Sequence, residues 1–85
     1  MNGYMIQMAL ECLLANLDSS NYDANTKHQL KCRVNRMIVG VSDNNPDGPK
    51  LDKVIISLGL NLLANSDADE DIKKMALQML GEYLP

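Results

Sequence analysis

The stretch from Leu51 to Asn65 decides the fold and reads LDKVIISLGLNLLAN. It is apolar on almost every side, because after its first turn the polar side chains Ser57, Asn61 and Asn65 fall four residues apart. On a helix this spacing makes one narrow polar stripe. A helix this apolar belongs inside a bundle, with only a thin strip facing water. Gly59, in its middle, predicts the close approach of a neighbouring helix.

Two other segments are predicted to be helices from their periodicity. Between Tyr4 and Leu17, leucines recur at i, i+3, i+4 and i+7 with few polar positions, which indicates a second mostly buried helix. Between Ile72 and Leu84, apolar residues follow the same helical spacing and charged residues occupy the opposite face. This second pattern is typical of a helix that covers one side of a core.

The fourth predicted helix begins after the polar turn at residues 18–21 and ends near Val39, with Gly40 as its C-terminal stop. Its N-terminal cap is a capping box of Ser20 with Asp23, or Asp23 or Asn25 alone. The inward positions are Thr26, Leu30, Val34, Met37, Ile38 and Val41, and the outward positions are His28, Cys32, Asn35 and Val39. The helix therefore has one apolar and one polar face.

The connections hold residues that favour turns and caps. Residues 42–50 are predicted to form a loop in which Asn45 to Gly48 fit a type I turn, and Pro49 is expected in the first turn of the helix that follows. One of two capping boxes is expected before the last helix, Ser66 with Asp69 or Asp67 with Glu70. Together the segments predict an all-α fold, a small four-helix bundle of two antiparallel helical hairpins that forms a single domain over residues 1–85.

Length and composition set further limits. Eighty-five residues make one domain with an adequate core. Cys12 and Cys32 are too few for a disulfide framework, and the first residues lack the basic region of a signal peptide. No apolar run approaches the ~18 residues of a membrane span. We therefore expect a cytoplasmic protein with reduced thiols and no membrane partner.

Charge is unevenly distributed along a chain of net charge −3. Residues 24–42 hold Lys27, Lys31, Arg33 and Arg36 without an acid, and residues 66–71 hold Asp67, Asp69, Glu70 and Asp71 without a base. The acidic total argues against a general nucleic-acid binder, because affinity there comes mainly from neutralising phosphates. Two solvated faces, or attraction between the two segments, explain the pattern without any ligand.

The sequence LLAN at residues 13–16 recurs at residues 62–65, which suggests two hairpins side by side. The second hairpin consists of an apolar helix, a short Asp-rich turn and a second helix. The residues that carry this pattern are Leu62, Leu63, Asp67, Asp69, Ile72, Lys73, Ala76 and Leu80. This third of the chain resembles a HEAT-type helical repeat. The first half departs from the pattern, because its turn is longer and residues 29–34 lack a small residue where helices cross. The resemblance implies a scaffold that binds other proteins, rather than a catalyst.

Candidate chemistry is sparse. His28 and Cys32 stand four apart, a spacing that places two metal ligands on one helix face, but a tetrahedral zinc site needs four ligands. An exposed histidine beside an incidental thiol is the preferred interpretation. A Cys–His nucleophile lacks an orienting acid, and residues 67–71 lack the glycine and distal glutamate of a calcium loop. We therefore expect no catalytic residue, no metal, no cofactor and no enzyme activity.

A contact surface is the hypothesis that remains. Cys32 and Val39 form a small apolar centre with a polar and basic rim, so the candidate partner-binding residues are Lys31, Cys32, Arg33, Asn35, Arg36 and Val39. Isolated apolar residues on a surface, which need no explanation, are an equal alternative. A bundle this small can also leave an edge of its two most apolar helices uncovered, and a homodimer would bury that edge.

The sequence thus predicts a non-catalytic protein–protein interaction module, such as a small adaptor, an inhibitor or a minor subunit of a larger assembly, whose partner is another protein. The binding surface is expected on the helix that ends near Val39, or on the edge of the two apolar helices. The alternative is a nucleic-acid-associated regulatory factor or polymerase cofactor that contacts phosphates through Lys27, Lys31, Arg33 and Arg36.

Overall fold

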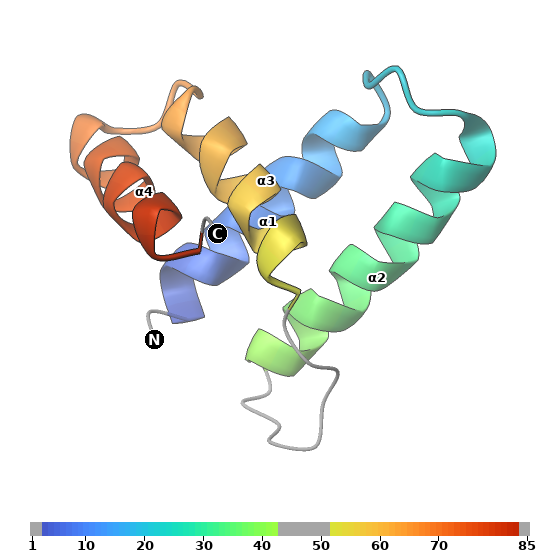
Figure 1. Cartoon of the computed structure of the whole chain (residues 1–85), viewed down its shortest axis with the longest axis horizontal. Coiled ribbons are helices and arrows are strands. Elements are labelled where there is room, and N and C mark those ends of the chain that lie inside the picture. The colour runs from blue at the N-terminus through green and yellow to red at the C-terminus, as the bar shows by residue number, and fades with distance from the viewer. Residues whose placement is uncertain (1–2, 43–51, 84–85) are drawn as a thin grey trace.

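The computed structural model describes residues 3–42 and 52–83, which form four α-helices and no strand (Figure 1). Helix α1 spans Gly3–Leu17, α2 Ala24–Ser42, α3 Lys53–Ala64 and α4 Glu70–Tyr83. Helix α1 packs against α2, and α3 packs against α4. The predicted all-α fold of two antiparallel hairpins is therefore confirmed. None of the described helices is long and apolar enough to cross a membrane.

The two hairpins meet where α3 crosses α1. A Cβ atom on Gly59 of α3 would lie 2.5 Å from the carbonyl oxygen and 2.8 Å from the carbonyl carbon of Ala9 in α1. Because these are backbone atoms, no side chain can rotate away to make room, and glycine is what lets the helices come this close. The close approach predicted at Gly59 is thus confirmed.

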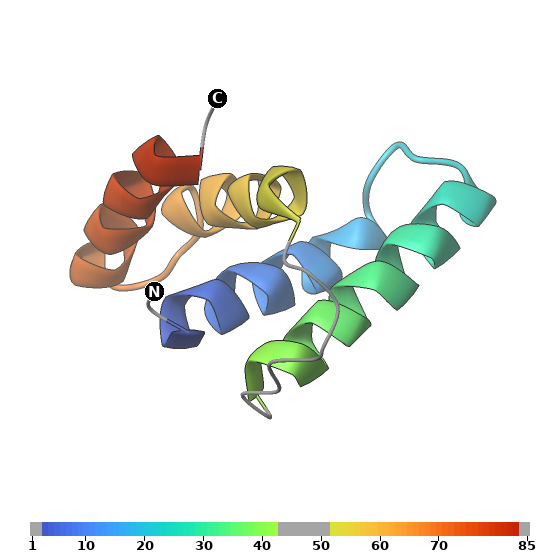
Figure 2. The same cartoon turned by 60° about the horizontal axis from the view of Figure 1, so that its bottom comes forward.

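The core surrounds this crossing, and α1 and α3 supply most of it, as their apolar sequences predict. The buried apolar residues are Met5, Ile6, Ala9, Leu10, Leu13 and Leu17 of α1, Val34 and Met37 of α2, Ile55, Ile56, Leu60 and Leu63 of α3, and Ala76 of α4. In α4 only Ala76 is fully buried, while Ile72, Met79, Leu80 and Tyr83 are partly buried against the core. Helices α2 and α4 therefore form the two outer edges of the molecule (Figure 2).

The boundaries of α2 differ from the prediction at one end. The helix continues through Gly40 to Ser42, so the expected stop near Val39 is wrong. A glycine inside a helix costs only about 1 kcal/mol relative to alanine, which does not end a helix that is already packed along its length. At the other end, Asp23 is the cap, because its carboxylate accepts the backbone N–H of Thr26 at 2.7 Å.

The start of α3 also differs from the prediction. Asp52 is its N-cap, with extended backbone and a carboxylate that accepts the N–H groups of Val54 at 2.9 Å and Ile55 at 3.4 Å. The helix therefore begins at Lys53 rather than near Leu51. Of the predicted loop at residues 42–50, Ser42 belongs to α2, while the type I turn at residues 45–48 and Pro49 lie outside the described residues.

The turn before α4 is built around Ser66 instead of a capping box. Its hydroxyl donates to the carbonyl of Leu63 at 2.6 Å and accepts the N–H of Ala68 at 3.2 Å. Asp69 directly precedes α4, and its carbonyl accepts the N–H of Lys73 at 3.0 Å. Within the described residues, neither predicted capping box forms.

Candidate partner-binding groove between α2 and α3

Helices α2 and α3 both pack against α1 but diverge from each other (Figure 1). Helix α4 lies on the other side of α3, so no described helix occupies the space above α1 between α2 and α3. A cavity lined by residues of α1, α2, α3 and the α1–α2 turn lies here, and we call this cavity with its α2 and α3 walls the α2–α3 groove. It exists because the fourth helix packs beside α3 and not between α2 and α3.

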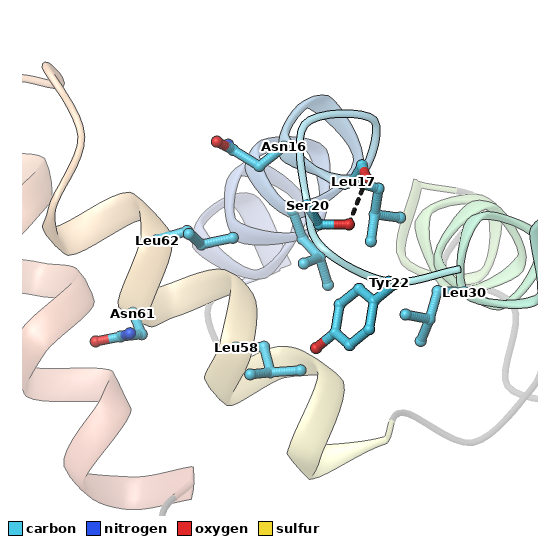
Figure 3. Close-up of a pocket in the computed structure, with 9 residues that line it drawn as sticks. Asn16, Leu17, Ser20, Tyr22, Leu30, Leu58, Asn61 and Leu62 are labelled. Carbon is cyan, nitrogen blue, oxygen red and sulfur yellow. Dashed lines mark hydrogen bonds between the residues drawn. The ribbon is translucent and has the colours of Figure 1, made fainter. Parts of the chain in front are cut away.

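A cavity of about 300 Å³ occupies the wide end of the groove (Figure 3). Its lining is mostly leucine, and the residues are Leu13, Asn16, Leu17, Ser20, Tyr22, Leu30, Leu58, Asn61 and Leu62. The volume is at the lower end of the range of ligand-binding clefts in proteins. The hydroxyl of Ser20 already donates to the Leu17 carbonyl at 2.6 Å, so the lining offers mainly apolar contact.

The α3 wall of the groove is an apolar stripe that is partly open to water. Val54, Leu58 and Leu62 follow one another at intervals of four residues and therefore share one side of the helix. Val54 is 68% exposed and Leu58 is 39% exposed, while Asn61 and Asn65 continue the exposed surface. The prediction that only a thin polar strip of α3 faces water is therefore wrong, because α2 does not cover this side.

An ion pair closes the narrow end of the groove. The guanidinium Nη2 of Arg33 in α2 lies 2.7 Å from Oδ2 of Asp52, whose Oδ1 caps α3. One carboxylate thus caps the start of α3 and links it to α2. The pair also shows which flank of α2 faces α3, and Gln29 and Arg36, four residues before and three after Arg33, lie on that flank.

Three of the four bases of α2 have partners, but these are not the acids of residues 66–71 that the sequence offered as one alternative. The ammonium of Lys31 forms an ion pair with the carboxylate of Asp18, and that of Lys27 donates to the Asp18 carbonyl at 3.0 Å. The hydrogen bond from Lys31, together with its charge, lowers the pKa of Asp18. Among the acids of the other segment, Glu70 pairs with Lys73 of its own helix at 3.1 Å.

The six residues predicted to bind a partner are distributed over the outer face and both flanks of α2. Cys32, Asn35 and Val39 lie on the outer face of α2, where Val39 is 57% exposed. Arg33 lies on the flank of α2 that faces Asp52, Arg36 follows it by three residues, and Lys31 lies on the opposite flank with Asp18. All but Lys31 are exposed. The surface predicted on α2 therefore stays a prediction, and only Arg33 among its six residues is engaged with α3.

The His28 and Cys32 side chains do approach each other. Nε2 of His28 lies 3.8 Å from the sulfur of Cys32, at the distance of a weak contact on an exposed helix face. Within the described residues, no group of three or more His, Cys, Asp or Glu side chains stands close enough to hold a metal ion. The pair therefore gives no support to a metal site.

The sequence did not reveal the groove residues Tyr22, Val54 and Leu58. Periodicity shows which positions of a helix are apolar, but not which neighbouring helix covers them. Tyr22 carried a usable signal, because a large aromatic residue within a polar turn is unusual. It is 47% exposed and lines the cavity from the α1–α2 turn.

Comparison of the chain with protein-family models, with curated proteins and with solved structures finds no match.

Proposed function

We propose that the protein is a non-catalytic protein-binding module, acting as an adaptor, inhibitor or minor subunit, and that it holds a segment of its partner in the α2–α3 groove. The observation that carries the proposal is the apolar stripe of Val54, Leu58 and Leu62, which borders a cavity of about 300 Å³ and is partly exposed. Contiguous apolar surface on a small domain is costly in water and marks interaction sites. The HEAT-type resemblance of the second hairpin implies the same class of function.

The basic residues of α2 favour this proposal over a nucleic-acid-associated role. Lys31 and Arg33 form ion pairs with Asp18 and Asp52, and Lys27 donates to a backbone carbonyl. Contact with phosphates would have to replace these interactions, and the chain as a whole is acidic. No observation among the described residues favours the nucleic-acid alternative.

Site-specific photo-cross-linking tests the proposal, and the chain offers a matched pair of tyrosines. Tyr22 lines the groove, while Tyr4 is more exposed and lies on α1 outside the lining. Benzoylphenylalanine introduced at each position, in cells of the source organism, is expected to capture one protein from Tyr22 and not from Tyr4. That protein, once purified, should bind the wild-type chain at a fixed stoichiometry in calorimetry.

The groove is then tested with Leu58→Asp. Placing a carboxylate on the α3 wall should weaken binding of the captured protein by about tenfold or more, because the charge would have to be buried at the interface. Gln78→Asp, on the exposed outer face of α4, is the control and should leave the affinity unchanged. Equal capture from both tyrosines, or an affinity that Leu58→Asp does not alter, would contradict the proposal.

A further inference from the structure

We infer that two copies of the free chain associate by packing the α3 stripe of Val54, Leu58 and Leu62 against the same stripe of the second copy, with the two α3 helices antiparallel. The inference goes beyond the proposed function, because it concerns the protein without its partner. It follows from the spacing of the apolar residues, from the neutral surface around them, and from the charges at the two ends of α3.

The apolar residues of the stripe are spaced so that the stripe matches itself when it is reversed. Val54 lies four residues before Leu58, and Leu62 lies four residues after it. In a symmetric dimer, a residue on the two-fold axis meets its own counterpart, and the residues on either side of it exchange partners. With the axis at Leu58, Leu58 would contact Leu58 of the second copy, and Val54 would contact Leu62 of the second copy. Each apolar residue of the stripe would therefore face another apolar residue.

The exposed line of α3 carries no charge that this pairing would bring together. After Lys53 in the first position, the exposed residues of α3 and its C-cap are Val54, Leu58, Asn61 and Asn65. A charged residue near a two-fold axis would face an identical charge, and like charges at an interface cost free energy. The neutral middle of α3 is therefore suited to contact with itself.

The two ends of α3 carry opposite charges, and antiparallel packing would bring opposite ends together. Lys53 is the first residue of α3, whereas Asp67 and Asp69 lie in the turn that follows the helix. All three residues are exposed and form no ion pair with described residues. Reversal of α3 would place Lys53 of each copy toward the acidic turn of the other copy. Complementary charges of this kind fix the orientation of two surfaces.

The charges along α2 have a matching arrangement. Leu30 of α2 and Leu58 of α3 both line the cavity, so they lie at one level of the groove. Asp23 precedes Leu30 by seven residues and Arg36 follows it by six, and neither forms an ion pair with described residues. In the antiparallel dimer, Arg36 of one copy would lie at the level of Asp23 of the second copy. Because one end is acidic and the other basic, a reversed copy matches this surface better than a segment with a single kind of charge.

The short stripe makes the association weak. From Val54 to Leu62 the stripe is about 12 Å long at the rise of an α-helix. The contact would be smaller than the interfaces of stable complexes, which bury about 1,200–2,000 Å². We therefore expect monomers with an open stripe in dilute solution and dimers at about 0.1–1 mM. At such concentrations, the second copy and the partner of the proposed function would compete for the stripe.

Sedimentation equilibrium and ¹⁵N nuclear magnetic resonance of the full chain test the inference. We expect the apparent mass to rise toward that of a dimer between about 0.01 and about 1 mM, while the amide signals of Leu58 and Leu62 shift. Leu58→Asp should keep the chain monomeric, because two carboxylates would meet at the axis. Gln78→Asp adds the same charge on the exposed outer face of α4 and should leave the dissociation constant unchanged.

A pair of charge-reversal variants tests the antiparallel arrangement. Lys53→Glu would place an acid against the acidic turn of the second copy, and Asp67→Lys would place a base against Lys53. Each variant alone should self-associate about fivefold or more weakly at low salt. An equimolar mixture should recover the association, because both ends of a mixed antiparallel dimer would again pair opposite charges. Both variants keep a negative net charge, so overall attraction does not explain such a recovery.

Two results would overturn the inference. One is a monomer at every concentration up to about 1 mM, and the other is self-association that Leu58→Asp leaves unchanged. A mixture that associates no better than its two components would overturn the antiparallel arrangement. The proposed function fails separately. A monomeric chain that still captures a different protein from Tyr22 loses only the inference, whereas a dimer from which Tyr22 captures no other protein contradicts only the proposed function.

Discussion

A Cβ atom on Gly59 would lie 2.5 Å from the carbonyl oxygen of Ala9, so the backbones of α3 and α1 are in direct contact where they cross. Substitution Gly59→Ala must separate the two helices and disturb the packing on both sides of the crossing. We expect it to lower the free energy of unfolding by about 1–3 kcal/mol, the usual cost of overpacking a core. Urea unfolding followed by circular dichroism measures this directly.

Gly81 provides the matched control. It lies in α4, and a Cβ there would meet nothing within 4 Å. Gly81→Ala should therefore stabilise the protein by about 0.5 kcal/mol, because alanine favours the helix and glycine does not. A Gly59→Ala variant as stable as Gly81→Ala would show that α1 and α3 do not cross at Gly59.

Leu58 and Leu60 are two residues apart in α3 and should respond differently to truncation. Leu60 is fully buried in the core, so Leu60→Ala should cost about 2–5 kcal/mol. Leu58 lies on the open wall of the groove at 39% exposure, and Leu58→Ala should cost about 1 kcal/mol or less. The comparison is made by chemical denaturation of the two variants, and equal losses would mean that the α3 wall is covered in the free protein.

The two roles of Asp52 can be separated by substitution. Asp52→Ala removes both the cap of α3 and the ion pair with Arg33, and should lower stability by about 1 kcal/mol or more. Asp52→Asn keeps a side-chain oxygen that can accept the N–H groups of Val54 and Ile55, so most of the loss should be absent. Thermal unfolding at low and high salt distinguishes the variants, and an Asp52→Asn variant as unstable as Asp52→Ala would rule out the capping role.

Two carboxylates in the α1–α2 turn should make stability depend on pH in acid. The Lys31 hydrogen bond and charge lower the pKa of Asp18, and the N–H of Thr26 lowers the pKa of Asp23. A carboxylate with a lower pKa in the folded state stabilises the fold above its unfolded pKa of about 3.9, and this contribution is lost as the pH falls through the folded value.

The double variant Asp18→Asn with Asp23→Asn is therefore expected to show a flatter melting temperature between about pH 5 and about pH 2 than the wild type. Differential scanning calorimetry over this range makes the comparison. The single variant Glu82→Gln, on the exposed surface of α4, serves as the control and should keep the wild-type slope. Identical slopes for the double variant and the wild type would contradict the roles assigned to Asp18 and Asp23.

The fold was predictable from sequence because its main signals are local. The spacing of apolar and polar residues identifies the four helices. Gly59 within an apolar helix indicates a helix crossing, because a glycine there allows a neighbouring helix to approach closely. The end of α2 was not predictable from Gly40, because a glycine ends a helix only when the chain leaves the helical path after it. Asp52 indicates the start of α3, because aspartate is a favoured N-cap residue and it stands directly before the apolar run.

The groove could not be predicted, because it depends on which helices are neighbours. Leu58 and Leu62 have the same apolar pattern as the buried Ile56 and Leu60, and only the placement of α4 beyond α3 leaves one side of α3 uncovered. The outward positions of α2 followed from periodicity. Pairing of Lys31 with Asp18 and of Arg33 with Asp52 depends on the approach of separate segments, which composition does not reveal.

The central claim is that α2 and α3 stand apart in the free protein and leave the α3 wall open to water. Solvent paramagnetic relaxation of methyl signals, with a soluble gadolinium chelate and dilute protein, measures this most directly. The account predicts strong relaxation of the Val54 and Leu58 methyl groups and weak relaxation of those of Ile56 and Leu60. Leu58 methyl groups as protected as those of Leu60 would mean that the groove is closed, and would contradict the account.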